Sequence, residues 1–226
     1  QRSSFDGPGI SIKGSINDSD AISKAMANQQ AVIHLAAKVA PLGSWKDFYS
    51  INVEGTRTLH AAAVTEGVSR FIYISTPSVA HSGSSISGGS ALPAMPDKVI
   101  GHYSKSKAVA ESWVLQQSNL PLPVVALRPH LVIGPGDPQL IGRVVDRALH
   151  NRLFTVGSGL TLVDTTWVDN AASAIIAALD RCEYLGGKAM VVSNGEPRTI
   201  FELFSQITSA ANIQWTPRSI SPKVAT

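Results

Sequence analysis

The sequence predicts an α/β fold with a doubly wound parallel sheet, and three observations support this. Short runs rich in β-branched and aromatic residues, such as 31–35 and 70–74, alternate with segments typical of helices, such as 45–66 and 103–117. Hydroxyl residues follow 70–74 directly, at the strand end where open α/β sheets bind their ligands. The segment 103–117 begins with Tyr and Lys four residues apart. Fold class and a polar site are therefore predicted together.

Composition agrees with one globular domain. The chain has 226 residues, 44% hydrophobic and 15% charged, enough for one domain spanning 1–226 with one core and a small appended lobe. The formal charge is +3 and the 19 basic residues are scattered, so no nucleic-acid partner is expected. No apolar run reaches ~18 residues, so no membrane span is expected. Cys182, the single cysteine, excludes an internal disulfide and fits a reducing, cytoplasmic location.

In chain order, the first feature is an absence. A dinucleotide fold needs a glycine-rich turn after its first strand, so that backbone can approach the pyrophosphate. The glycine clusters at 83–89 and 134–142 follow the wrong elements. We therefore expect the first strand and its glycine-rich loop to be missing, at least one βαβ unit of roughly 40 residues.

The other elements are expected from local pattern. Asn17 or Asp18 would cap the first helix. The segment 80–102, rich in Ser, Gly and Pro, is too long for an ordinary connection, which indicates a functional loop. Strands are expected at 10–13, 31–35, 70–74, 123–127, 154–167 and 190–193, and helices at 18–28, 45–66, 103–117, 138–152, 169–180 and 199–210.

Tyr103 and Lys107 form the first candidate pair. Four residues apart on a helix, they lie on one face, and that face continues inward through Ala110 and Val114. A phenol has a pKa near ~10, and a cation nearby favours the phenolate. The pair predicts a tyrosine that exchanges a proton with a substrate oxygen. Lysine is common enough that the pair alone is weak evidence.

Thr76 strengthens this interpretation. It lies just beyond the strand expected at 70–74, and a long loop leads from it to Tyr103. A hydroxyl at a strand end and a Tyr-Lys pair at a helix start can converge on one carbonyl oxygen.

Five ordered motifs carry a resemblance to a known family. They are Val-Ile-His-Leu-Ala-Ala at 32–37, Asn-Val-Glu-Gly-Thr at 52–56, Tyr-Ser-Lys-Ser-Lys at 103–107, Leu-Arg-Pro-His-Leu-Val-Ile-Gly-Pro-Gly-Asp at 127–137 and Thr-Trp-Val-Asp-Asn at 166–170. Together they resemble the extended short-chain dehydrogenase/reductases, and most closely the 3β-hydroxysteroid dehydrogenase-like branch. The resemblance implies a Rossmann-type fold that binds NAD or NADP. It also implies that the chain holds only part of a small C-terminal substrate lobe, which begins at about residue 137.

The resemblance also implies the roles of the site residues. Tyr103 would be the acid or base, Thr76 would hydrogen-bond the substrate oxygen, and Lys107 would bind the nicotinamide ribose and lower the phenol pKa. The implied reaction interconverts a secondary alcohol and a ketone on a hydrophobic substrate, such as a 3β-hydroxysteroid or a β-keto lipid. The implied substrate-facing residues are Thr76, Ser78, Leu131 and Arg143.

The implied cofactor surface draws on several strand ends. Arg2 would pair with a 2′-phosphate, which favours NADP over NAD, and Ser15 replaces the acid that relatives place against adenine. His81 and His102 lack a second ligand set, so no metal is expected. The implied cofactor-binding positions are Arg2, Ser15, Ile16, Leu35, Ala36, Ala37, Lys38, Asn52, Ser75, Tyr103, Lys107, Pro129, His130 and Val132.

Alternatives remain open at this point. A sugar-nucleotide epimerase or dehydratase uses the same Tyr and Lys, but the sequence shows no late cluster of Arg and Asn suited to a nucleotide diphosphate. A non-catalytic NAD(P)-sensing relative would keep the fold without turnover. The resemblance further implies a homodimer as one candidate assembly, through the helices containing Trp45 and Tyr103.

Overall fold

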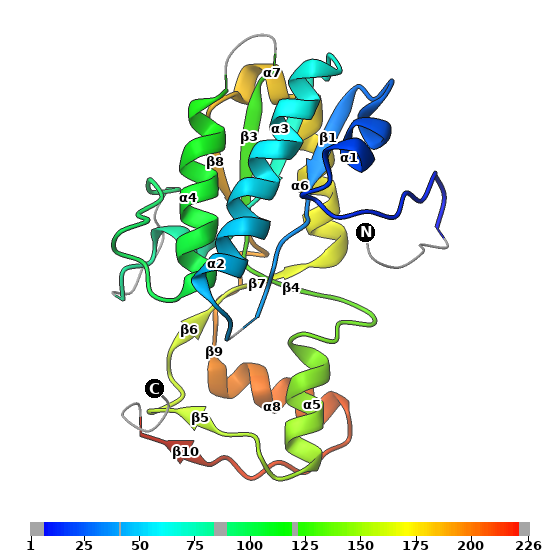
Figure 1. Cartoon of the computed structure of the whole chain (residues 1–226). Coiled ribbons are helices and arrows are strands. Elements are labelled where there is room, and N and C mark those ends of the chain that lie inside the picture. Colours follow the sequence, from blue (N-terminus) through cyan, green and yellow to red (C-terminus); the bar gives the residue numbers. More distant parts are fainter. Residues whose placement is uncertain (1–6, 41, 84–89, 119–121, 222–226) are drawn as a thin grey trace. The chain divides into compact units, whose positions relative to one another are not determined.

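The computed structural model describes residues 7–40, 42–83, 90–118 and 122–221, which form two compact units (Figure 1). The first, here called the sheet unit, comprises Gln1–Pro129 and Ser173–Val191. The second, here called the small unit, comprises His130–Ala172 and Val192–Thr226.

The sheet unit is built on four strands, in the order β1-β2-β3-β8. Their bounds are Ala31–His34 for β1, Arg70–Ile74 for β2, Val124–Pro129 for β3 and Ala189–Val192 for β8. β1 pairs with β2, and β2 with β3, in parallel. The predicted parallel α/β architecture is therefore confirmed.

The strand expected at residues 10–13 is not formed. A strand needs a neighbour to receive its backbone hydrogen bonds. β1 is the outer strand of the sheet, and in the described part of the chain no strand pairs with 10–13. Residues 10–15 are irregular instead.

Helices cover the sheet, with α3 and α4 side by side on one face (Figure 1). The Asp18 side chain accepts a hydrogen bond from the Ala21 amide at 3.1 Å and so begins α1, as predicted. The helix expected at 45–66 is continuous but contains a π-helical segment. The helices of this unit are α1 (Ser19–Met26), α2 (Trp45–Phe48), π-helix η1 (Tyr49–Glu54), α3 (Gly55–Thr65), 3₁₀-helix η2 (Pro77–Ala80), α4 (His102–Gln116), α7 (Cys182–Leu185) and the part of α6 (Val168–Asp180) from residue 173.

The core of the sheet unit lies between the strands and α1, α3 and α4. Small side chains on α3 and α4 allow these helices to approach the sheet closely, and each large side chain buried there contributes about 1.5–3 kcal/mol. Its buried members are Ile22, Met26, Val32, Val53, Ala63, Val68, Phe71, Tyr73, Ala110, Val114, Leu122, Val124 and Ala126.

The small unit has short elements and a small core. Val144, Ala148 and Leu153 form its buried cluster, against which Phe204 and Trp215 pack. β4 pairs with β7 and β5 with β10 in parallel, whereas β6 and β9 are antiparallel. The elements are β4 (Leu131–Ile133), α5 (Ile141–Leu149), β5 (Thr155–Val156), β6 (Leu162–Val163), β7 (Thr165–Trp167), the first residues of α6, β9 (Arg198–Thr199), α8 (Ile200–Ala210) and β10 (Ser219–Ile220).

The continuous strand pattern expected at 154–167 is wrong in extent. It divides into β5, β6 and β7. Gly157 and Gly159 adopt positive φ angles of 65° and 73°, so the backbone turns between β5 and β6. Hydrophobic pattern indicated extended backbone there, but the glycines determine where each strand stops.

Candidate active site

α4 carries the two central side chains of the candidate site. Its first turn follows Gly101, whose φ of 86° suits glycine. Tyr103 is partly buried, and Lys107, one turn later, is 3% exposed. Thr76 lies directly beyond β2 and caps η2, its side chain accepting a hydrogen bond from the Ser78 amide at 3.3 Å. The three residues predicted as catalytic thus all belong to the sheet unit.

The phenol of Tyr103 differs from the expectation in one respect. Burial raises its pKa above the ordinary value, and hydrogen bonding with Thr76 acts in the opposite direction. The sequence predicted a lowered pKa through Lys107. That prediction is wrong for this structure, because desolvation of the phenolate outweighs the hydrogen bond with Thr76, and Lys107 is not among the causes of the shift.

The ammonium of Lys107 contacts a backbone carbonyl and an aromatic ring. Its Nζ donates a hydrogen bond to the Ile74 carbonyl at 2.6 Å and lies 4.0 Å from the centroid of the Tyr73 ring. Burial lowers the pKa of Lys107 to about 7, although nearby Glu111 raises it in part. Lys107 therefore exchanges its proton near neutral pH, which few lysines do.

Asn52 lies in the π-helix η1, and its side chain joins two segments of the site. Its Oδ1 accepts a hydrogen bond from the Lys38 amide at 2.7 Å, and its Nδ2 donates to the Lys38 carbonyl at 3.2 Å and to Ser106 Oγ at 2.9 Å. Ser106 in turn donates to the Tyr103 carbonyl at 2.8 Å. Asn52 is 1% exposed, so it acts by holding the Lys38 backbone and the first turn of α4.

His34, the last residue of β1, belongs to the same buried hydrogen-bond network. Its Nε2 lies 2.9 Å from Thr56 Oγ1, and that hydroxyl donates to the Asn52 carbonyl at 2.6 Å. Because the hydroxyl proton is used there, the imidazole Nε2 must be the donor in the first contact. Burial, followed by the charge of Lys107, lowers the pKa of His34 to about 3. His34 is therefore a neutral, structural histidine at neutral pH.

A buried ion pair supports α4 from the β3 side. Arg128 donates to both carboxylate oxygens of Glu111, and its Nη1 donates to the Leu92 carbonyl at 2.6 Å. The two side chains are 2% and 1% exposed. The pair fixes β3, α4 and part of the long loop before α4 to one another.

Of the residues expected along the cofactor surface, those after β1 are largely exposed, whereas Ser75 after β2 is buried. Leu35 is 62% exposed, Ala36 is exposed, and Ala37 and Lys38 are partly buried, so the chain after β1 forms an open ledge. Ser75 is buried, and its Oγ has no hydrogen-bond partner among the described residues.

Two other expected cofactor residues have structural contacts. Ile16 packs against the sheet-unit core. The Ser15 carbonyl accepts a hydrogen bond from the Asp18 amide at 3.1 Å, and its Oγ accepts one from the Asn17 amide at 3.3 Å. These contacts shape the turn before α1. Arg2 lies outside the described residues.

The remaining expected site residues, apart from Ser78 in η2, lie at or beyond the end of β3. Pro129 ends β3. Leu131 and Val132, on β4 of the small unit, are each 41% exposed. The His130 amide donates to the Val192 carbonyl at 2.9 Å. Arg143 is exposed on α5, and Ser78 bonds Thr76 through their hydroxyls at 3.1 Å.

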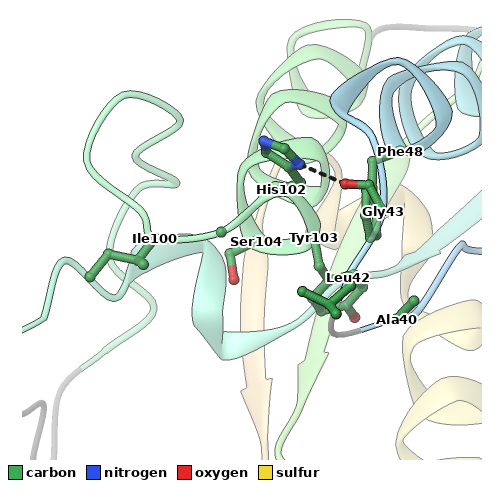
Figure 2. A pocket seen from close by; sticks show the side chains of 9 residues that line it. Ala40, Leu42, Gly43, Phe48, Ile100, His102, Tyr103 and Ser104 are labelled. Carbon is green, nitrogen blue, oxygen red and sulfur yellow. Dashed lines mark hydrogen bonds between the residues drawn. The ribbon is translucent and has the colours of Figure 1, made fainter. Parts of the chain in front are cut away.

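A pocket of about 450 Å³ opens beside Tyr103 (Figure 2). It is bounded by the segment after β1, by Phe48 and by the start of α4. Its lining residues are Ala40, Leu42, Gly43, Phe48, Ile100, Gly101, His102, Tyr103 and Ser104.

Sequence reasoning missed several of these residues. Thr56, Ser106 and Arg128 lay inside quoted motifs but received no role, because their contacts are made across the fold. Leu42 and Ile100 could have been noticed as large apolar residues beside Gly43 and Gly101, in otherwise turn-rich segments.

Metal ligands and membrane-spanning helices also bear on function. Among residues 7–40, 42–83, 90–118 and 122–221, no group of three or more His, Cys, Asp or Glu side chains could hold a metal ion. Over the same residues, every helix is too short or too polar to cross a membrane.

Comparisons with known proteins agree on one family. The sequence profile described as the 3-beta hydroxysteroid dehydrogenase/isomerase family matches residues 3–217. A 2-alkyl-3-oxoalkanoate reductase of Stenotrophomonas maltophilia is 38% identical over 219 residues, covering 95% of this chain and 66% of that protein. The human sterol-4-alpha-carboxylate 3-dehydrogenase, decarboxylating, is 30% identical, covering 93% and 58%. The chain thus spans less than two thirds of the length of these relatives.

Solved structures give the same fold. The dTDP-glucose 4,6-dehydratase DesIV of Streptomyces venezuelae, solved with NAD bound, has a TM-score of 0.79 at 25% identity, covering 92% of this chain and 66% of that one. MoeE5, solved with UDP-glucuronic acid and NAD, has a TM-score of 0.81 at 25% identity, covering 97% and 75%.

Proposed function

The chain belongs to the 3-beta hydroxysteroid dehydrogenase/isomerase family, and we propose that it acts as an NAD(P)-dependent oxidoreductase on a hydrophobic secondary alcohol or ketone. The observation that carries the proposal is the grouping of Thr76 and Lys107 with the partly buried Tyr103 at the carboxyl end of β2. The bacterial relative's name, 2-alkyl-3-oxoalkanoate reductase, points to an alkyl-substituted β-keto acid as the substrate class.

The described residues fit a dinucleotide in two ways. The ledge formed by Leu35, Ala36 and Ala37 is open and has small side chains at its end, which lets a ribose or phosphate approach backbone. Ser75 Oγ is an unpartnered buried hydroxyl at the end of β2. These residues, with Lys107, would hold the cofactor, and the nicotinamide supplies or accepts a hydride when bound.

Tyr103 would hold the proton that the substrate oxygen exchanges. Burial raises the pKa of this phenol, so Tyr103 would act as the acid that donates a proton to a ketone oxygen. Thr76 would orient the same oxygen by a hydrogen bond. Asn52 and Ser106 would keep Tyr103 in place through its carbonyl.

The small unit carries the other residues that we propose for the substrate. Leu131 and Val132 present half-exposed apolar side chains on β4, and Arg143 is an exposed cation on α5 that would bind a carboxylate. The sheet unit would then act as the cofactor-binding domain and the small unit as the substrate lobe.

The test combines cofactor binding with turnover. NADH and NADPH are titrated into the protein and followed by nicotinamide fluorescence, and the preferred cofactor is then used to reduce β-keto esters. Tyr103→Phe should lower turnover by about 10²–10⁴-fold without changing cofactor affinity. Tyr184→Phe removes a hydroxyl from a residue that is 80% exposed and should change neither. Parental turnover in Tyr103→Phe would overturn the proposal.

A second candidate function is a sugar-nucleotide epimerase or dehydratase. The similarity in fold to two proteins solved with NAD, one a dTDP-glucose 4,6-dehydratase and one in complex with UDP-glucuronic acid, favours it. A substrate panel of β-keto esters, hydroxysterols and nucleotide sugars separates the two functions. Turnover of a nucleotide sugar, with none of the hydrophobic ketones, would select the second.

A further inference from the structure

The pocket beside Tyr103 has an apolar wall that the proposed chemistry leaves unexplained. Leu42 and Phe48 line it on one side, and Ile100 lies on the other side of Ser104 (Figure 2). Phe48 is 1% exposed at the base, whereas Leu42 and Ile100 are 85% and 76% exposed. Large apolar side chains exposed around a cavity are typical of a site that binds an apolar group.

Two glycines fix the segments that carry these side chains. Gly43, next to Leu42, has a φ of 151°, and Gly101, next to Ile100, has a φ of 86°. A Cβ on Gly43 would also lie 3.1 Å from the Phe48 ring. Both backbone conformations are unfavourable for residues other than glycine. Gly43 and Gly101 therefore help to determine where the neighbouring Leu42 and Ile100 lie.

A hydrogen bond joins the two segments. His102 Nδ1 lies 3.0 Å from the Gly43 carbonyl, drawn as a dashed line in Figure 2, and it must donate because a carbonyl only accepts. The His102 ring also lies 5.9 Å from the Trp45 ring and 6.2 Å from the Phe48 ring, centroid to centroid. His102 therefore ties the wall that carries Leu42 to the turn of α4 that carries Tyr103.

We propose, on the basis of the proposed function, that this pocket receives an alkyl chain attached to the carbon that bears the reacting oxygen, and that His102 is the positioning residue that keeps its wall in place. The phenol at one edge of the pocket binds the oxygen, and Leu42, Phe48 and Ile100 contact the chain. The volume of about 450 Å³ falls in the range of small-ligand sites. The substrate class is thereby narrowed to ketones or alcohols with a long alkyl branch.

The first experiment measures binding by calorimetry, without turnover. A long-chain and a short-chain 3-oxoester are titrated into the parent protein and into the double variant Leu42→Ser, Ile100→Ser. We expect the double variant to lose about tenfold in affinity for the long-chain ester, the equivalent of a few methylene contacts, and nothing for the short-chain ester. The control Ile10→Ser changes a side chain that is 92% exposed in the same unit and outside the pocket, and it should bind both like the parent.

The second experiment tests His102 through a pair of variants. His102→Phe keeps a ring but lacks the donor, and should weaken the long-chain ester severalfold while leaving the short-chain ester unchanged. His102→Asn places an amide donor near the position of Nδ1 and should restore most of the affinity. Equal weakening in both variants would show that the hydrogen bond to Gly43 has no positioning role.

The outcomes separate this inference from the proposed function. Equal losses for both esters in the double variant, or no loss for either, would overturn the alkyl pocket even if the protein reduces ketones. Selective loss for the long-chain ester in a protein that never oxidises NADH or NADPH would support the pocket and overturn the oxidoreductase. The alkyl assignment would also be overturned if the double variant lost affinity for a hydroxysterol but kept its affinity for the long-chain ester.

Discussion

The sheet unit and the small unit are stabilised by different kinds of contact. In the sheet unit, α4 is fixed from several sides by buried polar contacts, through Lys107, Ser106 and the Glu111–Arg128 pair. The small unit has a three-residue buried cluster and short strands, with several half-exposed apolar side chains. A rigid scaffold therefore carries the candidate catalytic residues, while the small unit is the part that can vary without disturbing them.

Lowering the pH should show the difference in stability between the two units most clearly. The pKa of His34 is about 3 in the folded chain and 6.5 ordinarily, so the unfolded state binds more protons between these values and stability rises with pH across that window. Lowering the pH from 6.5 to 3 should cost the sheet unit at most about 5 kcal/mol. Urea unfolding at a series of pH values measures this.

A variant of His34 and a comparison with the small unit test whether this pH dependence comes from His34. His34→Gln should remove most of the pH dependence in this window. In the small unit, hydrogen bonds from Thr199 lower the pKa of Glu202, so its contribution is lost only as the pH falls below the ordinary value of 4.5. Variants that retain only Trp113 or only Trp215 report on the two units separately. Simultaneous loss of both signals from pH 6.5 downward would contradict the comparison.

Breaking the buried ion pair should have the next largest effect. Glu111→Gln leaves Arg128 buried without its counter-charge, and we expect a loss of about 3–5 kcal/mol in the free energy of unfolding. The matched control is Glu54→Gln, because its pair with Arg57 is 37% and 47% exposed and should contribute below about 1 kcal/mol. Equal urea midpoints for the two variants would show that the pair does not hold α4.

Cavity-forming substitutions compare the two cores directly. Leu122→Ala, in the sheet unit, and Leu153→Ala, in the small unit, remove the same atoms from residues that are 1% and 4% exposed. We expect about 4 kcal/mol for Leu122 and about 2–3 kcal/mol for Leu153, because the smaller cluster can collapse around the space. Thermal unfolding followed by single-tryptophan fluorescence separates them, and a larger loss at Leu153 would reverse our ranking of the two cores.

Local pattern predicted the sheet unit well. The strands at 31–35 and 70–74 and the helix at 103–117 are each found within a residue or two, because continuous apolar runs and helical periodicity determine them. Asn17 or Asp18 was expected as the cap of α1 from residue type, and the structure shows that it is Asp18. The strand at 10–13 failed because pairing depends on a neighbouring strand, which a local pattern does not contain.

The sequence predicted that three polar residues come together, but not their pKa values. Thr76, Tyr103 and Lys107 are close in the fold as expected, yet the pKa of Tyr103 is raised and that of Lys107 is lowered to about 7. Both shifts come first from burial, and a sequence gives spacing along a helix without giving depth. Asn52 was expected at the cofactor, but its amide is occupied by Lys38 and Ser106, which lie far from it in the sequence.

The π-helix η1 has a consequence for how this protein can change. A π turn holds one more residue than an α turn, so η1 takes up that residue locally while α2 and α3 keep their relative rotation. Removing a single residue from Tyr49–Glu54 would let the segment close into an ordinary α turn, and Thr56 and Ala63 would keep their directions. A one-residue deletion within α3 (Gly55–Thr65) has no extra residue to absorb it, and it would rotate the side chains that follow by about 100°.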